Sequence, residues 1–132
     1  GTGPLDEKLR KQYATNKNII FTGHLSAQEV VSLVTNATAM VIPSIWYENN
    51  PLSVIESLCM GTPVIGARMG GIPELIQTPE SGLLFDCHNT DELKQCIEKM
   101  FEQQPHTPST IATPARERYS EAAYLLQLEA LF

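Results

Sequence analysis

Two glutamates and the start of a predicted helix form the densest group of chemically capable residues in the sequence. Glu48 and Glu56 lie eight positions apart, and the helix is expected to begin between them. A carboxylate is a good acceptor for two adjacent hydroxyls but a poor partner for a phosphate. The pair could therefore hold hydroxyl groups at two points of one ligand. Two glutamates at this spacing also occur by chance on solvated surfaces, so the spacing alone leaves both interpretations open.

The helix start itself is a candidate anion site. The first amides of a helix have no carbonyl partner, and the helix dipole favours negative charge at this end. Asn50 is expected to cap the helix and Pro51 to take its first position, where the missing N–H removes no hydrogen bond. The expected donors are then the amides of Leu52, Ser53 and Val54. A diphosphate with hydroxyls on either side, as in a nucleotide sugar, would match this order.

Apolar runs that alternate with helical patterns must position these residues. Short apolar runs are typical of strands buried on both faces of a parallel sheet, and they lie at 18–22, 39–42, 63–66 and 82–85. Apolar residues at helical spacing lie between them, at 4–13, 26–37, 51–59 and 89–101. Ser26 and Glu29 fit a capping box. The order predicts an α/β domain with a parallel sheet flanked by helices.

The alternation ends near residue 104, and the rest of the chain has a different character. Residues 105–114 contain three prolines and several hydroxyl side chains, which indicates a linker. Residues 115–132 are predicted to form one amphipathic helix that packs on this domain or on another surface.

Composition excludes several classes of protein. The chain has 132 residues and a formal net charge of -6, too acidic for a nucleic-acid binder. No apolar run approaches the roughly 20 residues that cross a bilayer. Cys59, Cys87 and Cys96 are an odd number without C-x-x-C spacing, which favours reduced thiols in a cytoplasmic protein. Cys87 and His88 lack further ligands at zinc spacing, so no metal site is expected.

Other residues near the two glutamates, or in the later glycine motif, are expected to have mainly structural roles or to line the site. Trp46 and Tyr47 are expected either to wall a sugar pocket or to pack beneath their loop. Arg68 is expected at the surface, and the pair Gly70–Gly71 is expected to permit a tight turn from strand to helix.

Taken in order, the motifs resemble one enzyme family. They are Gly1–Pro4 (GTGP), residues 18–26 (NIIFTGHLS), Pro43–Ser44, Glu48 plus seven residues plus Glu56, residues 61–66 (GTPVIG), residues 70–76 (GGIPELI) and residues 119–124 (YSEAAY). This set resembles the C-terminal, donor-binding domain of retaining glycosyltransferase family 4, the glycosyl transferases group 1 with the GT-B fold. The resemblance implies a Rossmann-like domain over residues 1–104.

The resemblance also implies roles for single residues. Glu48 would bind hydroxyls of the donor sugar at the catalytic centre, and Glu56 would bind the ribose hydroxyls. The amides at the helix start would cradle the distal phosphates. Gly23 and His24 would flank the nucleobase, while Gly3 would line the phosphate end of the cleft. Many members carry glycine-phenylalanine-glycine after the first glutamate, where this chain has Asn49, Asn50 and Pro51, so which amides meet the phosphate stays open.

The implied activity is transfer of a sugar, with retention, from a UDP-, GDP- or ADP-sugar and without a cofactor. The family binds its acceptor on an N-terminal domain, which this sequence does not contain. The family strand order, 3-2-1-4-5-6, would place two missing strands between the runs at 18–22 and 39–42. We therefore expect a fragment that is inactive alone and binds donor weakly. Its sheet would be completed by direct pairing, by a dimer or strand exchange, or by residues outside this sequence.

The full-length enzyme would be cytoplasmic or peripheral to a membrane. Two alternatives remain open. One is an epimerase-like or sugar-nucleotide-binding module of the GT-B type. The other is a non-catalytic interaction domain that docks through the helix at 115–132.

Overall fold

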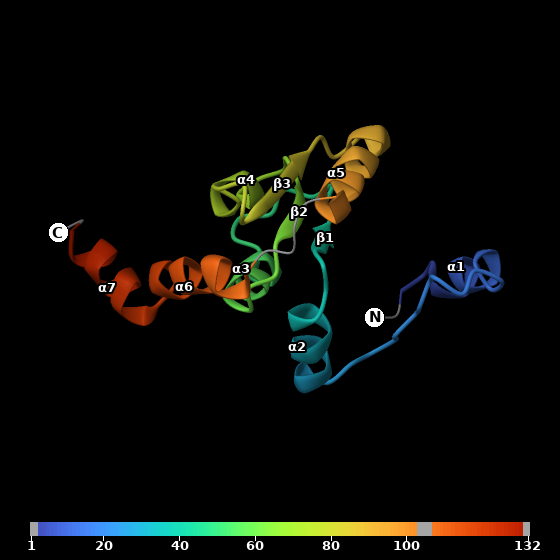
Figure 1. Ribbon diagram of the computed structural model, residues 1–132, viewed down its shortest axis with the longest axis horizontal. Coiled ribbons are helices and arrows are strands. Elements are labelled where there is room, and N and C mark those ends of the chain that lie inside the picture. Colours follow the sequence, from blue (N-terminus) through green and yellow to red (C-terminus); the bar gives the residue numbers. More distant parts are fainter. Residues whose placement is uncertain (1–2, 103–106, 131–132) are drawn as a thin grey trace. The chain divides into compact units, whose positions relative to one another are not determined.

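The computed structural model describes residues 3–102 and 107–130. The chain divides into two compact units, Gly1–Ser32 and Leu33–Phe132, which are described here one at a time (Figure 1). None of the described helices is long and apolar enough to span a membrane.

The first unit contains helix α1 (Asp6–Gln12) and the beginning of α2 (Ala27–Thr35). The capping box that opens α2 is confirmed: the Glu29 carboxylate accepts the Ser26 N–H at 2.8 Å, and the Glu29 N–H donates to Ser26 Oγ at 3.4 Å. The strand predicted at 18–22 is wrong, since these residues form no strand. Ile20 is 81% exposed. A strand needs a neighbour for its backbone groups, and the described part of this unit supplies none.

The second unit is built on three parallel strands. These are β1 (Met40–Ile42), β2 (Val64–Ala67) and β3 (Gly82–Phe85), in the spatial order β1-β2-β3. Val64 pairs with Met40 on one side and with Gly82 on the other. Every residue of the central strand β2 is buried, as expected for a strand covered on both faces. The predicted parallel sheet is confirmed, and among the described residues it ends at β1.

Among the described residues, five helices lie wholly within this unit: α3 (Leu52–Cys59), α4 (Ile72–Leu75), α5 (Thr90–Glu102), α6 (Pro108–Arg118) and α7 (Glu121–Glu129). Successive residues of a strand face opposite sides of the sheet. Val64 therefore packs in a core with residues of α3, α4 and α6, whereas its neighbour Ile65 packs in a second core with α5. The predicted layered α/β architecture is confirmed.

The predicted linker at 105–114 is wrong where the structure describes it, because α6 begins at Pro108; residues 105 and 106 lie outside the described residues. Pro108 occupies a first-turn position, where proline is tolerated. Pro114 lies inside the helix but is exposed, while Ile111 and Ala115 are buried in the core beside α3. Burial of this apolar stripe outweighs the cost of the internal proline.

The single helix predicted over 115–132 is also wrong. The chain leaves α6 at Tyr119, and Ser120 starts α7 by accepting the Ala123 N–H on its hydroxyl at 3.1 Å. A serine in this position stabilises a new helix start rather than continuation of the old helix. The compact second unit therefore includes α6, and the division predicted after residue 104 does not separate α6 from the core.

Candidate functional site

The carboxyl ends of parallel strands share one edge of a sheet, where α/β proteins place their binding loops. Three loops leave the sheet at this edge of the second unit. They are the glutamate loop (residues 43–51) after β1, the glycine loop (residues 68–71) after β2, and the turn at residues 86–89 after β3. The first contains Glu48.

Glu48 is half-buried within the glutamate loop. The Ser44 hydroxyl donates to Glu48 Oε1 at 3.2 Å, and the Glu48 N–H donates to the Trp46 carbonyl at 2.9 Å. Trp46 and Tyr47 are 77% and 86% exposed. Packing of these two rings beneath the loop is therefore wrong, and their role as a wall of the sugar pocket stays a prediction.

The glycine loop holds the backbone of the glutamate loop. The Gly71 N–H donates to the Glu48 carbonyl at 2.7 Å. A Cβ on Gly70, whose φ is +55°, would lie 2.1 Å from the Glu48 carbonyl oxygen, and one on Gly71 would lie 2.1 Å from that of Asn49. The positive φ fits the predicted turn. The close approach to the glutamate loop, at Glu48 for Gly70 and at Asn49 for Gly71, is a second reason for these glycines, and the sequence pattern showed only the first.

Helix α3 begins one residue later than predicted. Pro51 is the N-cap, with φ −68° and ψ 106°, so the assignment of Asn50 as the cap is wrong. The extended ψ of Pro51 delays the first helical residue to Leu52. The Val54 N–H donates to the Pro51 carbonyl at 3.0 Å, and the Val54 side chain is fully buried. Within the described chain, the amides of Leu52 and Ser53 donate to no protein acceptor.

Glu56 is exposed on α3, four residues after the helix begins and thus about 6 Å along its axis. The structure therefore brings Glu48, the two free amides and Glu56 onto one loop and the helix that follows it. Gly3, Gly23 and His24 belong to the first compact unit. There His24 is exposed and Gly23 has a φ of +69°, and their predicted contacts with donor stay predictions.

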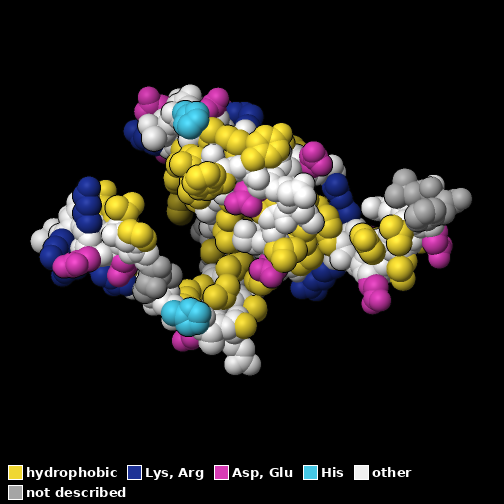
Figure 2. Space-filling model, turned by 180° about the vertical axis from the view of Figure 1, so that it is seen from behind, with side chains coloured by type: hydrophobic (Ala, Val, Ile, Leu, Met, Phe, Trp, Pro, Cys, Tyr) yellow, Lys and Arg dark blue, Asp and Glu magenta, His cyan; other side chains and the backbone are white. Residues whose placement is uncertain are grey.

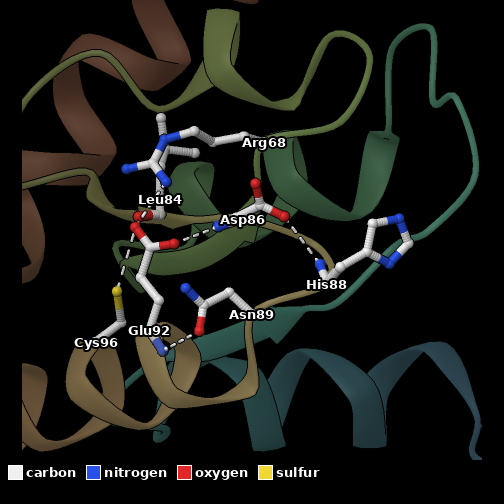
Figure 3. Close-up of polar contacts among 7 residues, drawn as sticks. All are labelled: Arg68, Leu84, Asp86, His88, Asn89, Glu92 and Cys96. Carbon is white, nitrogen blue, oxygen red and sulfur yellow. Dashed lines mark hydrogen bonds and ion pairs between the residues drawn. The ribbon is translucent and has the colours of Figure 1, made fainter.

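A charged clamp ties the glycine loop to the turn after β3 (Figure 3). Arg68 Nη1 lies 2.7 Å from Glu92 Oε1, and Glu92 Oε2 accepts the Asp86 N–H at 2.7 Å. The Arg68 N–H donates to the Phe85 carbonyl at 2.7 Å. The hydrogen bond from Arg68, followed by that from Asp86, lowers the pKa of Glu92. Arg68 is at the surface as predicted, yet it is paired across 24 positions of sequence.

The turn after β3 has a structural explanation without a metal. Asp86 Oδ1 accepts the His88 N–H at 3.0 Å, and Asn89 Oδ1 caps α5 by accepting the Glu92 N–H at 3.0 Å (Figure 3). In the parts of the chain that the structure describes, no three metal-binding side chains gather. Burial raises the pKa of the Cys96 thiol, which lies 3.8 Å from the Leu84 carbonyl oxygen.

A hollow of about 530 Å³ lies beside the start of α3 and was not predicted from the sequence. Its lining includes Asn50 and Leu52 from the α3 side, Glu74 from α4, and Arg118 and Tyr119 from the end of α6. The Arg118 guanidinium lies 5.3 Å from the centroid of the Tyr119 ring and donates to the Glu74 carbonyl at 3.4 Å. Sequence spacing could not reveal it, because its walls come from separate segments near residues 50, 74 and 118.

Tyr119 offers a test of this packing. Among the described residues, its hydroxyl is buried without a hydrogen-bond partner, and burial raises its pKa. Because an unsatisfied buried group is destabilising, Tyr119→Phe should raise the free energy of unfolding by up to about 1 kcal/mol. Urea unfolding checks this, with the exposed Tyr124→Phe as the matched control, which should change by less than about 0.5 kcal/mol. A clear loss of stability in Tyr119→Phe would show that the hydroxyl has a partner.

The chain is similar in sequence to known transferases and in structure to a solved synthase. A sulfoquinovosyl transferase of Arabidopsis thaliana is 33% identical over 100 residues, covering 76% of this chain and 19% of that protein. A D-inositol 3-phosphate glycosyltransferase of Corynebacterium aurimucosum is 26% identical over 126 residues, covering 94% and 30%. The solved sucrose-phosphate synthase of Thermosynechococcus elongatus superposes with a TM-score of 0.73 at 27% identity, covering 96% and 32%.

The chain thus spans less than a third of the length of each of these relatives. The superposition over nearly the whole chain supports the predicted Rossmann-like fold of the GT-B type. Residues 1–125, which include the glutamate loop, α3 and the glycine loop, match the family described as glycosyl transferases group 1. On the evidence of this match, the chain belongs to the glycosyl transferases group 1 family.

Proposed function

We propose that this chain is the donor-binding part of a retaining glycosyltransferase that takes its sugar from a UDP-, GDP- or ADP-sugar. The observation that carries the proposal is the arrangement at the start of α3. Two amides without a partner among the described residues follow a loop that presents the half-buried Glu48, and Glu56 comes one turn further along. This arrangement suits a ligand with hydroxyls at both ends and a diphosphate between them.

The proposed chemistry assigns each group one task. The Glu48 carboxylate accepts hydrogen bonds from hydroxyls of the donor sugar and so orients the sugar for transfer. The amides of Leu52 and Ser53 stabilise the negative charge that develops on the diphosphate as it leaves. Glu56 accepts hydrogen bonds from the ribose. The acceptor is proposed to bind to a domain outside this sequence. The full-length enzyme is proposed to act in the cytoplasm or at a membrane surface. No cofactor takes part in the proposed reaction.

A titration with matched ligands tests the assignment. Glu48→Gln should weaken binding of the nucleotide sugar about tenfold but leave binding of the nucleoside diphosphate unchanged, because only the sugar reaches Glu48. Glu56→Gln should weaken both by a similar factor. Binding is followed by NMR with UDP-, GDP- and ADP-glucose and the corresponding diphosphates, and Glu98→Gln on the exposed face of α5 is the control. Equal loss of both ligands in Glu48→Gln would contradict the proposed role of Glu48.

A non-catalytic interaction domain is the second candidate. Helix α7 favours it, because Tyr124, Leu126 and Leu128 are all exposed. Hydrophobic side chains, drawn in yellow, are also visible on the face shown in Figure 2. Absence of any nucleotide binding at millimolar concentration would favour this candidate over the donor-binding proposal.

A further inference from the structure

The clamp of Arg68 and Glu92 lies at the first residue of the glycine loop. The last residue of the loop, Gly71, contacts Glu48. Between Ala67 and Ile72 the loop is held by short backbone contacts. The Met69 N–H donates to the Ala67 carbonyl at 2.7 Å, and the Ile72 N–H donates to the Met69 carbonyl at 3.2 Å. Because the loop is only four residues long and is bonded at both ends, we expect a displacement of Arg68 to reach Gly71. The Gly71 N–H, at the far end, is the group that holds the Glu48 carbonyl.

The Glu92 carboxylate binds Arg68 and the Asp86 N–H instead of the backbone N–H of the residue that caps its helix. Glu92 is the third residue of α5, after the cap Asn89, where a glutamate normally reaches back to the cap N–H. Glu29 does so in α2, where its carboxylate accepts the Ser26 N–H at 2.8 Å. In α5 the Asn89 N–H donates instead to the Asp86 carbonyl at 2.9 Å. The Glu92 carboxylate is thereby left to bind Arg68 and the Asp86 amide.

The exposure of the clamp argues against a role in stability alone. The side chains of Arg68 and Glu92 are 51% and 29% exposed, and such pairs typically contribute less than about 1 kcal/mol. Arg68 and Glu92 join two loops that both leave the carboxyl edge of the sheet (Figure 3). A weak but directional contact at this place fixes loop geometry more than it fixes the fold.

We propose that Arg68 and Glu92 are positioning residues, which hold the glycine loop so that Gly70 and Gly71 keep Glu48 aligned with the donor sugar. The inference rests on the proposed function for the role of Glu48 toward the sugar. The coupling from Arg68 to the Glu48 backbone rests on the contacts alone. The two can therefore be tested separately.

Hydrogen exchange of the Gly71 amide tests the coupling without any ligand. Arg68→Gln and Glu92→Gln should each speed exchange of this amide by about tenfold, because the bond to the Glu48 carbonyl opens more often. Arg68→Lys, which keeps the charge, should restore most of the protection. Lys94→Gln is the matched control, since Lys94 and Glu98 form an exposed pair on the same helix at 3.7 Å. Unchanged Gly71 exchange in Arg68→Gln and Glu92→Gln would overturn the inference.

Ligand titration then tests the consequence. Arg68→Gln should lower affinity for the nucleotide sugar three- to tenfold while affinity for the nucleoside diphosphate stays at the wild-type value. If wild-type protein binds the nucleotide sugar and Arg68→Gln binds it equally well, the positioning role is wrong. If wild-type protein binds neither ligand but Gly71 exchange still responds to Arg68→Gln, the proposed function fails and the mechanical coupling stands.

Discussion

Gly70→Ala should destabilise the second unit by about 2 to 5 kcal/mol and release the glutamate loop. A side chain at φ +55° has a conformational cost of about 1 to 2 kcal/mol. The new Cβ would also lie 2.1 Å from the Glu48 carbonyl oxygen, so the backbone must move, which adds about 1 to 3 kcal/mol. The clash cannot be relieved by a side-chain rotation, because the atoms nearest to the new Cβ are backbone atoms of Glu48.

Urea unfolding measures the loss of stability, and fluorescence reports on the loop directly. Trp46 is the single tryptophan of the chain and lies within the glutamate loop, so a shifted emission spectrum in folded Gly70→Ala indicates displacement of this loop. Gly3→Ala is the control, because a Cβ there meets no atom within 4 Å. A Gly70→Ala protein with wild-type stability and wild-type Trp46 emission would contradict the observed approach of the two loops.

Leu58→Ala should cost about 2 to 5 kcal/mol, the range for a leucine truncated in a packed core. Leu58 is 2% exposed and lies in the core that also contains Ile111 and Ala115 of α6. Removing its side chain leaves a cavity where α3 and α6 meet. Because α3 carries the free amides and Glu56, the same change should also weaken nucleotide binding.

Leu52→Ala on the same helix is the matched control. Leu52 is 65% exposed, so its truncation should change the free energy of unfolding by less than about 0.5 kcal/mol. The comparison is made by urea unfolding followed by far-ultraviolet circular dichroism. Equal losses in the two variants would mean that α3 presents a different side to the core.

The sequence predicted those parts of the fold that depend on local pattern. The run around Val64 is apolar at every position, as is typical of a short strand covered on both faces, and β2 is such a strand. The capping box of Ser26 and Glu29 was equally visible, because its two partners lie three residues apart. Both features can be decided from neighbouring residues.

The predictions that failed depend on what lies across space. The run at 18–22 has the composition of a strand, but the described part of its unit contains no neighbouring strand. The prolines near residue 108 indicate a linker, yet burial of Ile111 and Ala115 against α3 keeps this segment helical. Single-sequence patterns contain neither the missing neighbour nor the burying surface.

The candidate site follows the same division. Glu48 and Glu56 could be identified from their types and spacing. The support beneath Glu48 could not, because Gly71 lies 23 positions further along and the pattern of two glycines indicates only a turn. The clamp of Arg68 and Glu92 was likewise hidden, since both residues are ordinary surface charges until the fold brings them together.

The two cores on opposite faces of the sheet become complete at different moments of synthesis. The core beside α5 needs nothing beyond Met100, whereas the core beside α3 needs Ile111 and Ala115. While the chain emerges from the ribosome, the apolar side of α3 must therefore wait for more than fifty residues of later sequence before α6 can cover it. A nascent chain halted after residue 104 would leave Leu58 without the cover that α6 gives it, and an uncovered apolar surface favours aggregation.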